Sequence, residues 1–399
     1  MQTRIIRFYI FILFFLISAS SAFSEDTISE INITGLSRTK PQAMMELLEK
    51  FKGLPAENFD TSQVVNELQQ TGLFSQTDVS ADGSALNITV AEKLSLLPIP
   101  FAYASSDSFG AGMMLMDNNA FGIMDQAGIG GLIANDKWRA MASYSHSQKG
   151  DAPFGWHIGA SSGTGKTKLR NEKRDSIITF DNTMVNASAG INRKLLPWLK
   201  ASLETGFNMC YVDDSEPSSA MAVPVSVSLS ARNAIWDGTF LDKTFLTAKV
   251  TYNFSFWGND FYELSVRGLW EKHLVQRLRL IADAGALYAP DVPAVFARNQ
   301  NAMFISLLNS NYRISSAAGA GAGLEWGITN ASFGTPSIYA QYQICQADGV
   351  LSDDILAHGP VLGFKFYLKK IAFPAIDIFA AYNVQTGLLR TSAGAGFSM

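Results

Sequence analysis

The chain has 399 residues, a formal net charge of −4, only 17% charged residues, 12% aromatic residues and 32 glycines. An ordinary soluble domain carries about 25% charged residues, so this chain is poor in the side chains that keep a surface in water. The negative net charge gives no support to a general role in nucleic-acid binding. The two cysteines, Cys210 and Cys345, are too far apart to suggest a metal site or a disulfide framework.

The first residues predict export from the cytoplasm. Arg4 and Arg7 precede an apolar run from Phe8 to Ile17, and small residues follow up to Ala22. This order is typical of a secretory signal peptide, and the run is too short to cross a bilayer as a helix. We therefore predict a signal peptide over residues 1–24 rather than a buried N-terminal helix, and no later apolar stretch has the length of a transmembrane helix.

Residues 25–95 predict a small α+β domain with the order β-α-α-β-β. An isoleucine-rich strand comes first, two short helices with apolar residues at helical spacing follow, and two strands around residues 76–80 and 86–90 close the unit. Its length fits one domain. Residues typical of caps and turns separate these elements: Gly35, Pro41, Gly53, Asp60 or Thr61, Gly72 and Asp82-Gly83.

From residue 96 onward the pattern changes to alternating strands. In residues 225–230, valine and leucine alternate with serine, and residues 362–368 show the same period of two. One apolar face and one small or polar face is the pattern of a strand with lipid outside and an aqueous lumen inside. We place strand centres at Ala102, Met114, Gly130, Ala142, Ile158, Val185, Leu203, Val227, Val250, Leu264, Ile281, Gly323, Tyr342, Phe364, Ile378 and Ala395.

The predicted fold class is mainly β: a transmembrane antiparallel β-barrel of about sixteen strands over residues 96–399, after the small α+β domain. An even number of strands closes the sheet without a free edge and puts both barrel ends of the chain on one side. The alternative is a soluble β-sandwich, which would need polar outward faces. The outward faces here carry Phe, Leu, Ile, Val and Tyr with few charges.

The N-terminal domain resembles a POTRA domain. The resemblance rests on "ISEINITGLSRTK", "TGLFSQTDVS" and "LNITVAEK". They match a first strand ending in a Gly-hydrophobic turn, a Gly-hydrophobic-Phe before the second strand, and a closing strand ending in Glu-Lys. The likeness covers nearly all of the segment, and it implies that the domain is periplasmic.

The barrel region resembles the superfamily of BamA, TamA and the two-partner secretion transporters. "DNNAFG" looks like the family's turn after an early strand, and "YELSVRGLWEKHLVQRLRLIADAGALYA" is similar to the tenth and eleventh strands. The last four strands match in order, as "SIYAQYQICQADG", "GPVLGFKFYL", "PAIDIFAAYN" and "TSAGAGFSM". With the export signal, this implies an outer-membrane protein with a multi-pass barrel.

The resemblance also implies a lock inside the barrel. In the family, a long loop after strand eleven folds into the lumen, and an Arg at its tip meets a Glu of strand twelve and an Asp of strand thirteen. Glu325 stands where that Glu belongs, and Gln341 replaces the Asp. The loop between Pro290 and Ser316 has no intact Arg-Gly, so Arg313 is the candidate partner of Glu325, with an ordinary lumenal ion pair for Glu325 as the alternative.

Three other motifs are not read as sites. Val266-Arg267-Gly268 matches the loop-tip string but belongs to the tenth strand. Residues 160–167 spell a Walker-A variant, but a charged segment follows instead of the amphipathic helix that a phosphate loop needs. The four histidines are not at metal spacing, and no Ser-His-Asp order with a nucleophile elbow occurs. We therefore expect no enzyme, no metal and no cofactor.

The resemblance implies a factor that inserts outer-membrane proteins or moves polypeptides across the membrane. The N-terminal domain would capture client strands by β-augmentation, and the seam between first and last strands would open laterally. Candidate seam residues are Phe101, Tyr103, Gly394, Gly396 and Phe397. The expected partners are unfolded outer-membrane or secreted polypeptides and membrane lipid, and not nucleic acid. The family also leaves room for accessory periplasmic proteins.

A single POTRA-like domain departs from BamA-type factors, which usually carry several. Two alternatives therefore stay open: a dedicated secretion pore for one substrate, and a plain barrel that acts as a channel or surface antigen. Loss of many barrel proteins on depletion would indicate insertion, loss of one exported protein would indicate secretion, and neither loss would indicate the plain barrel.

Overall fold

The computed structural model describes residues 26–57, 59–105, 109–148, 152–213, 216–236, 241–303, 305–309, 311–329, 331, 334–368 and 374–395. The predicted signal peptide lies outside these residues. The described chain forms two compact units, one over the residues up to Ser95 and one over most of the remainder from Leu96.

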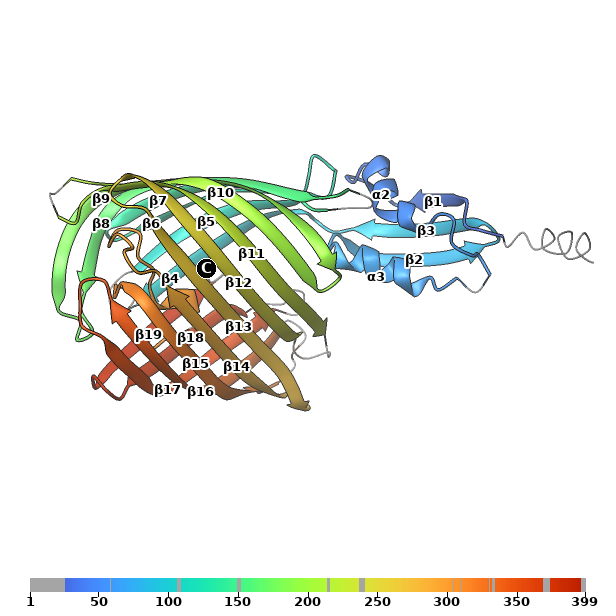
Figure 1. Ribbon diagram of the computed structural model, residues 1–399. Coiled ribbons are helices and arrows are strands. Elements are labelled where there is room, and N and C mark those ends of the chain that lie inside the picture. The colour runs from blue at the N-terminus through green and yellow to red at the C-terminus, as the bar shows by residue number, and fades with distance from the viewer. Residues whose placement is uncertain are drawn as a thin grey trace, which may run out of the picture. The chain divides into compact units, whose positions relative to one another are not determined.

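The N-terminal unit is a three-stranded sheet with two helices (Figure 1). Its sheet order is β1-β3-β2, with β1 parallel and β2 antiparallel to the central strand. This agrees with the predicted order of elements. The elements are β1 (Glu30–Thr34), α2 (Pro41–Leu48), the 3₁₀ turn η1 (Glu49–Phe51), α3 (Ser62–Gln70), β2 (Phe74–Asp82) and β3 (Ala85–Glu92).

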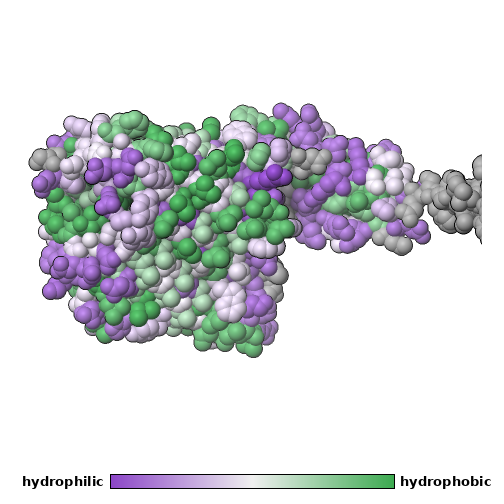
Figure 2. All heavy atoms as spheres, in the orientation of Figure 1, coloured by the Kyte–Doolittle hydropathy of each residue, from purple (hydrophilic) through white to green (hydrophobic). Residues whose placement is uncertain are grey.

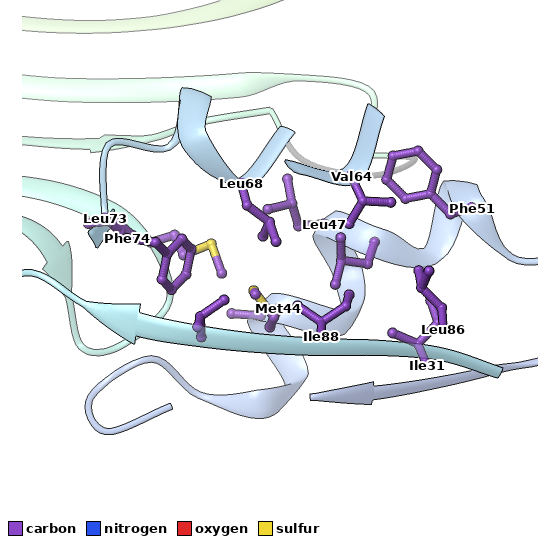
Figure 3. Packing of buried hydrophobic residues seen from close by; sticks show 14 of the residues in the cluster. Ile31, Met44, Leu47, Phe51, Val64, Leu68, Leu73, Phe74, Leu86 and Ile88 are labelled. Atoms are coloured by element: carbon purple, nitrogen blue, oxygen red, sulfur yellow. The ribbon is translucent and has the colours of Figure 1, made fainter. Parts of the chain in front are cut away.

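The core of this unit lies between the helices and one face of the sheet (Figure 3). Met44 and Leu48 of α2 and Val64 and Leu68 of α3 are fully buried, and they pack in one cluster with alternate residues of β3. Helical spacing brings each pair to one face, while a period of two sends every second residue of β3 inward. Burying each of these side chains contributes about 1.5–3 kcal/mol, before the entropy cost of folding.

The turn after β1 is fixed by a glycine and a carboxylate. Gly35 has φ +86°, and a Cβ there would lie 1.9 Å from the carbonyl oxygen of Val90, so no other residue fits. Glu92, at the end of β3, accepts hydrogen bonds from the backbone N–H groups of Ser37, Arg38 and Thr39 at 2.9–3.2 Å. The Gly-hydrophobic turn and the closing Glu-Lys, which carried the sequence resemblance, therefore meet in space.

In the described part of the chain, the second unit is a closed antiparallel barrel of sixteen strands (Figure 1). Every predicted strand centre lies within one of them. The strands are β4 (Leu96–Ser105), β5 (Phe109–Ala120), β6 (Asp125–Ala134), β7 (Lys137–His146), β8 (Gly155–Arg170), β9 (Ser176–Leu196), β10 (Leu199–Val212), β11 (Ala220–Trp236), β12 (Leu241–Trp257), β13 (Phe261–Val275), β14 (Leu278–Tyr288), β15 (Ile314–Gly327), β16 (Gly334–Gly349), β17 (Ile355–Leu368), β18 (Pro374–Asn383) and β19 (Leu388–Ala395).

The outward face of the barrel is apolar. Val227 and Leu229 of β11 are 56% and 48% exposed, whereas Ser226 between neighbouring outward positions is 4% exposed. Figure 2 shows hydrophobic side chains over much of the visible barrel face and mainly hydrophilic ones over the N-terminal unit. The soluble sandwich is therefore excluded, because its outward faces would be polar. None of the described helices is both long and apolar enough to cross a membrane.

Strand β4 begins with Leu96 at one end of the barrel and ends with Ser105 at the other. The two ends are called the Leu96 end and the Ser105 end. The longest described connection joins β14 to β15 at the Ser105 end, spans residues 289–313 and contains the 3₁₀ turn η2 (Gln300–Met303). This connection is called the lumenal loop. The Walker-like string of residues 160–167 lies within β8, which confirms that no phosphate loop forms there.

Candidate functional site

The lumenal loop folds into the barrel and packs against its inner wall. Its second half buries Met303, Ile305, Leu307, Leu308 and Tyr312. The wall of β14 to β18 meets these residues with small side chains, which leave room for the loop: Ala317, Cys345, Ala347, Ala357 and Ala381. A Cβ on Gly285 or Gly319 would lie about 3 Å from atoms of Met303 or Ile305. The second half of the loop is therefore a packed apolar plug.

The first half of the loop reaches another part of the wall. Val295 and Phe296 pack against a cluster formed by Leu169 of β8, Phe180 of β9 and Cys210 of β10. Arg298 donates from Nε to Glu263 of β13 at 3.1 Å. The loop therefore bridges two separate arcs of the wall, which fits the predicted position of a family loop between strands eleven and twelve.

One loop residue, Ser306, is bound through its backbone by two strands. Its N–H donates to Oε1 of Gln343 on β16 at 2.8 Å, and its carbonyl accepts from Nη1 of Arg390 on β19 at 2.9 Å. Arg390 also stacks over the ring of Phe379 at 5.4 Å. The loop is thus attached both to the wall and to the last strand.

Among the described residues, the most buried ion pair of the barrel lies between β14 and β15. Arg279 and Glu325 lie directly opposite each other in the strand register, and both side chains are almost fully buried. Nη2 and Nε of Arg279 contact Oε2 of Glu325 at 2.7 and 3.0 Å. Nη1 of Arg279 contacts Glu271 of β13 at 3.1 Å. Opposite charges that face each other across two strands stabilise the strand pair. Because both side chains are buried, removing either one would leave the other as an uncompensated buried charge.

Two further strands complete this network. Oγ of Ser337 on β16 donates to Oε1 of Glu325 at 2.5 Å, and Nη2 of Arg279 donates to the hydroxyl of Tyr367 on β17 at 2.7 Å. Nζ of Lys365, also on β17, lies 3.8 Å from Glu325. Two cations and two carboxylates thus balance across five neighbouring strands, β13 to β17. We call this set the wall network.

The prediction that Arg313 pairs with Glu325 is wrong. Arg313 directly precedes β15, and Glu325 is near the other end of the same strand. Twelve residues at about 3.3 Å each separate them by about 40 Å, so the two side chains cannot meet. Arg279 takes the place of the loop arginine, and the lock at Glu325 joins wall to wall. Glu325 instead forms an ordinary lumenal ion pair, which was the alternative prediction.

Gln341 does not join the wall network either. Its amide nitrogen is hydrogen-bonded to Asp283 of β14, and its carbonyl accepts from Gln343 at 3.1 Å. A Cβ on Gly321 would lie within 2.9 Å of both Asp283 and Gln341, so this glycine provides the space in which they meet. Asp283 of β14 thus provides the carboxylate that β16 lacks at position 341. Gln341 and Gln343 then form a chain of amides that ends at the backbone N–H of Ser306.

Sequence reasoning missed Arg279, Arg390 and Gln343. A usable signal existed for Arg279: it lies on the same strand face as Asp283 by the period of two. The strand pairing needed to place it opposite Glu325 comes only from the register. Arg267 and Gly268 lie within β13, the tenth barrel strand, where the sequence placed them.

The seam between β19 and β4 is short. In the described residues it has four partner pairs, Ser392 with Ser105 through Ala395 with Ala102, whereas β4 and β5 share nine. Gly394 lies opposite Tyr103. Phe101 belongs to β4 but has no described partner on β19, and Gly396 and Phe397 lie outside the described residues. Small side chains offer little cross-strand packing.

Other candidate chemistry does not assemble. Among the described residues, no three of His, Cys, Asp and Glu come together as a metal site. Cys210 and Cys345 are both free and buried, on β10 and β16. The described lumen thus offers ion pairs and amide contacts between wall and loop.

The barrel fold is that of BamA and CdiB. The structure is similar to BamA from Haemophilus ducreyi lacking POTRA domains 1–3, with a TM-score of 0.62, 11% identity, and coverage of 92% of this chain and 84% of that one. It is similar to CdiB from Escherichia coli, with a TM-score of 0.67, 13% identity, and coverage of 94% and 77%. For CdiB from Acinetobacter baumannii the values are 0.66, 10%, 93% and 74%.

No protein-family model matches the sequence, and neither does any curated protein. At these identities the three structures establish a shared fold. The structural neighbours of the chain are therefore the BamA and CdiB barrels, as the sequence resemblance predicted.

Proposed function

We propose that this protein is an outer-membrane factor that inserts β-barrel proteins into the membrane or moves polypeptides across it. The observation that carries this proposal is the seam, which has four described residue pairs, three of them between serines or alanines, in an otherwise extensively paired barrel. A strand edge exposed to lipid is costly, because its backbone groups have no water to bind. An opened seam therefore offers its edges to a client hairpin.

The N-terminal unit supports this proposal with an accessible edge. Its sheet order leaves β2 as an edge strand of nine residues, most of them exposed. An extended polypeptide can add to such an edge through main-chain hydrogen bonds. We interpret the unit as a POTRA domain that lies in the periplasm and holds client strands before they reach the barrel.

A disulfide across the seam tests the proposal. Ala104 and Ala393 are direct register partners on β4 and β19, and cysteines at both positions would join the two strands. The assay is made with Cys210→Ser and Cys345→Ser, so that the added cysteines are the only thiols. We expect the oxidised protein to lose activity in a depletion strain and to regain it on reduction. Full activity in the oxidised protein would exclude a lateral gate.

The matched control is a disulfide between Ala380 and Thr391, which are register partners on β18 and β19. This bond lies on the last strand but leaves the seam free, so activity should be retained. The same depletion strain separates the two activities. Loss of many outer-membrane barrels supports insertion, whereas loss of one exported protein supports secretion.

A further inference from the structure

We infer that the lumen binds a carboxylate of a polypeptide segment at Arg313, within a polar cavity beside the lumenal loop. This inference deepens the proposed function and rests on it, because the ligand would be a client polypeptide. The cavity has a volume of about 400 Å³ and is bounded by β7 to β13 and by the first half of the loop. Cavities of this size accommodate small ligands or a few residues.

Arg313 is the group that requires a ligand. It lines the cavity, and its Nε is buried without a hydrogen-bond partner. No described residue forms an ion pair with it. The residue as a whole is only partly exposed, and a partly buried guanidinium without an anion is unfavourable, so its environment favours a negatively charged ligand.

The other charges of the cavity leave an excess of positive charge. Lys249 contacts Glu204 at 3.3 Å, and Arg298 contacts Glu263 at 3.1 Å, so these four groups neutralise one another in pairs. Among the described lining residues, Arg313 and the exposed Arg139 remain without a carboxylate. The cavity therefore attracts anions, and Arg313, whose Nε is buried, is the less exposed of these two arginines.

The uncharged lining fits a peptide. Asparagine amides provide both donors and acceptors, as a peptide backbone requires. A planar carboxylate matches the fork of a guanidinium, and an extended chain would place its backbone along the amides. The lining asparagines are Asn182, Asn186, Asn208, Asn253 and Asn299. An acidic side chain of a client would meet Arg313 through its carboxylate.

The test measures binding to the purified full-length protein in detergent. The probe is a fluorescein-labelled Gly/Ser peptide with one central glutamate and an amidated end, and its matched control carries glutamine instead. We expect the glutamate peptide to bind about tenfold more tightly, a ratio typical of one added charge-assisted contact. Equal binding of the two peptides would overturn the inference.

Variants assign the effect to Arg313. Arg313→Gln should abolish the preference for glutamate, and Arg313→Lys should keep part of it. The control Lys168→Gln removes one charge from the exposed face of β8, next to cavity-lining Leu169, and should change nothing. A preference that survives in Arg313→Gln would contradict the site.

Two further readouts exclude other roles for Arg313. Ligand-free Arg313→Gln should be at least as heat-stable as the parent, because it removes an uncompensated, partly buried charge. A clear loss of stability would instead make Arg313 a structural residue. Inorganic phosphate serves as competitor, and tighter binding of phosphate than of the glutamate peptide would assign the site to an inorganic anion. Because this assay needs no client insertion, its result is independent of the seam disulfide.

Discussion

The wall of β13 to β17 and the seam of β19 with β4 belong to one closed sheet, yet different forces hold them. The wall has long ladders, and charged side chains of four of its strands, together with Ser337 of β16, form a buried network. The seam has four described pairs, and serine, alanine and glycine form most of them. The seam has both fewer described backbone pairs and smaller side chains than the wall, so we expect it to separate first.

The largest expected effect is at Arg279. Arg279→Gln would leave the carboxylates of Glu271 and Glu325 buried near each other without their shared cation. Removing one partner of a buried pair costs about 3–5 kcal/mol. We expect the variant barrel to unfold at a clearly lower temperature, measured by the loss of its compact band on SDS gels.

A double variant is the control for this prediction. Arg279→Met with Glu325→Leu removes the two main charges of the wall network. One carboxylate, Glu271, and one cation, Lys365, remain, so the remaining charges still balance. The double variant should be markedly more stable than the single variant, because no uncompensated charge is added. If Arg279→Gln unfolds at the parent temperature, the wall network does not stabilise this part of the barrel.

The next effect concerns the N-terminal unit and should leave both barrel regions unchanged. Glu92→Gln weakens three backbone hydrogen bonds to a carboxylate, at a cost of about 1–2 kcal/mol in this partly solvated position. All seven tryptophans lie beyond residue 130, whereas the described α-helices lie in the N-terminal unit. Helical circular dichroism should therefore shift in urea while tryptophan fluorescence does not.

The same carboxylate predicts a pH dependence. Burial tends to raise the pKa of Glu92, but hydrogen bonds from Thr39, Arg38 and Ser37 outweigh it and lower the pKa below its usual 4.5. A carboxylate with a lowered pKa stabilises the folded state above the pKa of the unfolded chain, and this contribution is lost as the pH falls through the folded value. The difference between Glu92→Gln and the parent should thus vanish in acid. An unchanged difference there would exclude the carboxylate as its cause.

A smaller effect is expected where the loop meets the last strand. Arg390→Met removes the hydrogen bond to the carbonyl of Ser306, worth about 1 kcal/mol. The loop should become more sensitive to protease in the folded barrel. Gln343→Leu removes only the hydrogen bond that joins Ser306 to β16. Comparing the two variants therefore separates the effect of attachment to the wall from that of attachment to the last strand. Equal effects of the two variants on client insertion would show that attachment to the last strand has no special role.

The smallest effect is at the seam itself. Ala104→Val with Ala393→Val adds a β-branched pair across β4 and β19, worth about 0.2–1 kcal/mol. We expect slower client insertion at unchanged overall stability. The control is Ala282→Val with Ala322→Val, a register pair on the wall. If the wall pair slows insertion as much as the seam pair, opening does not occur at the seam.

The strands were predictable because their signal is local. A period of two is present in each segment, so residues such as Val227 and Ile378 mark strand centres without knowledge of their neighbours. The order of elements in the N-terminal unit follows from Pro41, Gly53 and Gly72 for the same reason. The even number of strands then implies closure.

The site was less predictable because its contacts are not local. The partner of Glu325 is 46 positions away and depends on the register of β14 with β15. Strand length alone would have excluded Arg313, since it adjoins the strand that carries Glu325. No sequence pattern indicated that Ser306 would be bound through its backbone, because backbone groups are common to every residue.

The two hydrogen bonds of Ser306 also have a mechanical consequence. They join β16 and β19, which are three strand spacings or about 14 Å apart along the sheet, through a single residue inside the curve. Such a link across the inside of the sheet fixes the curvature between β16 and β19. If the barrel changes its cross-section when the seam separates, the bending must take place in the remaining strands, and β19 should keep its shape as β4 moves away.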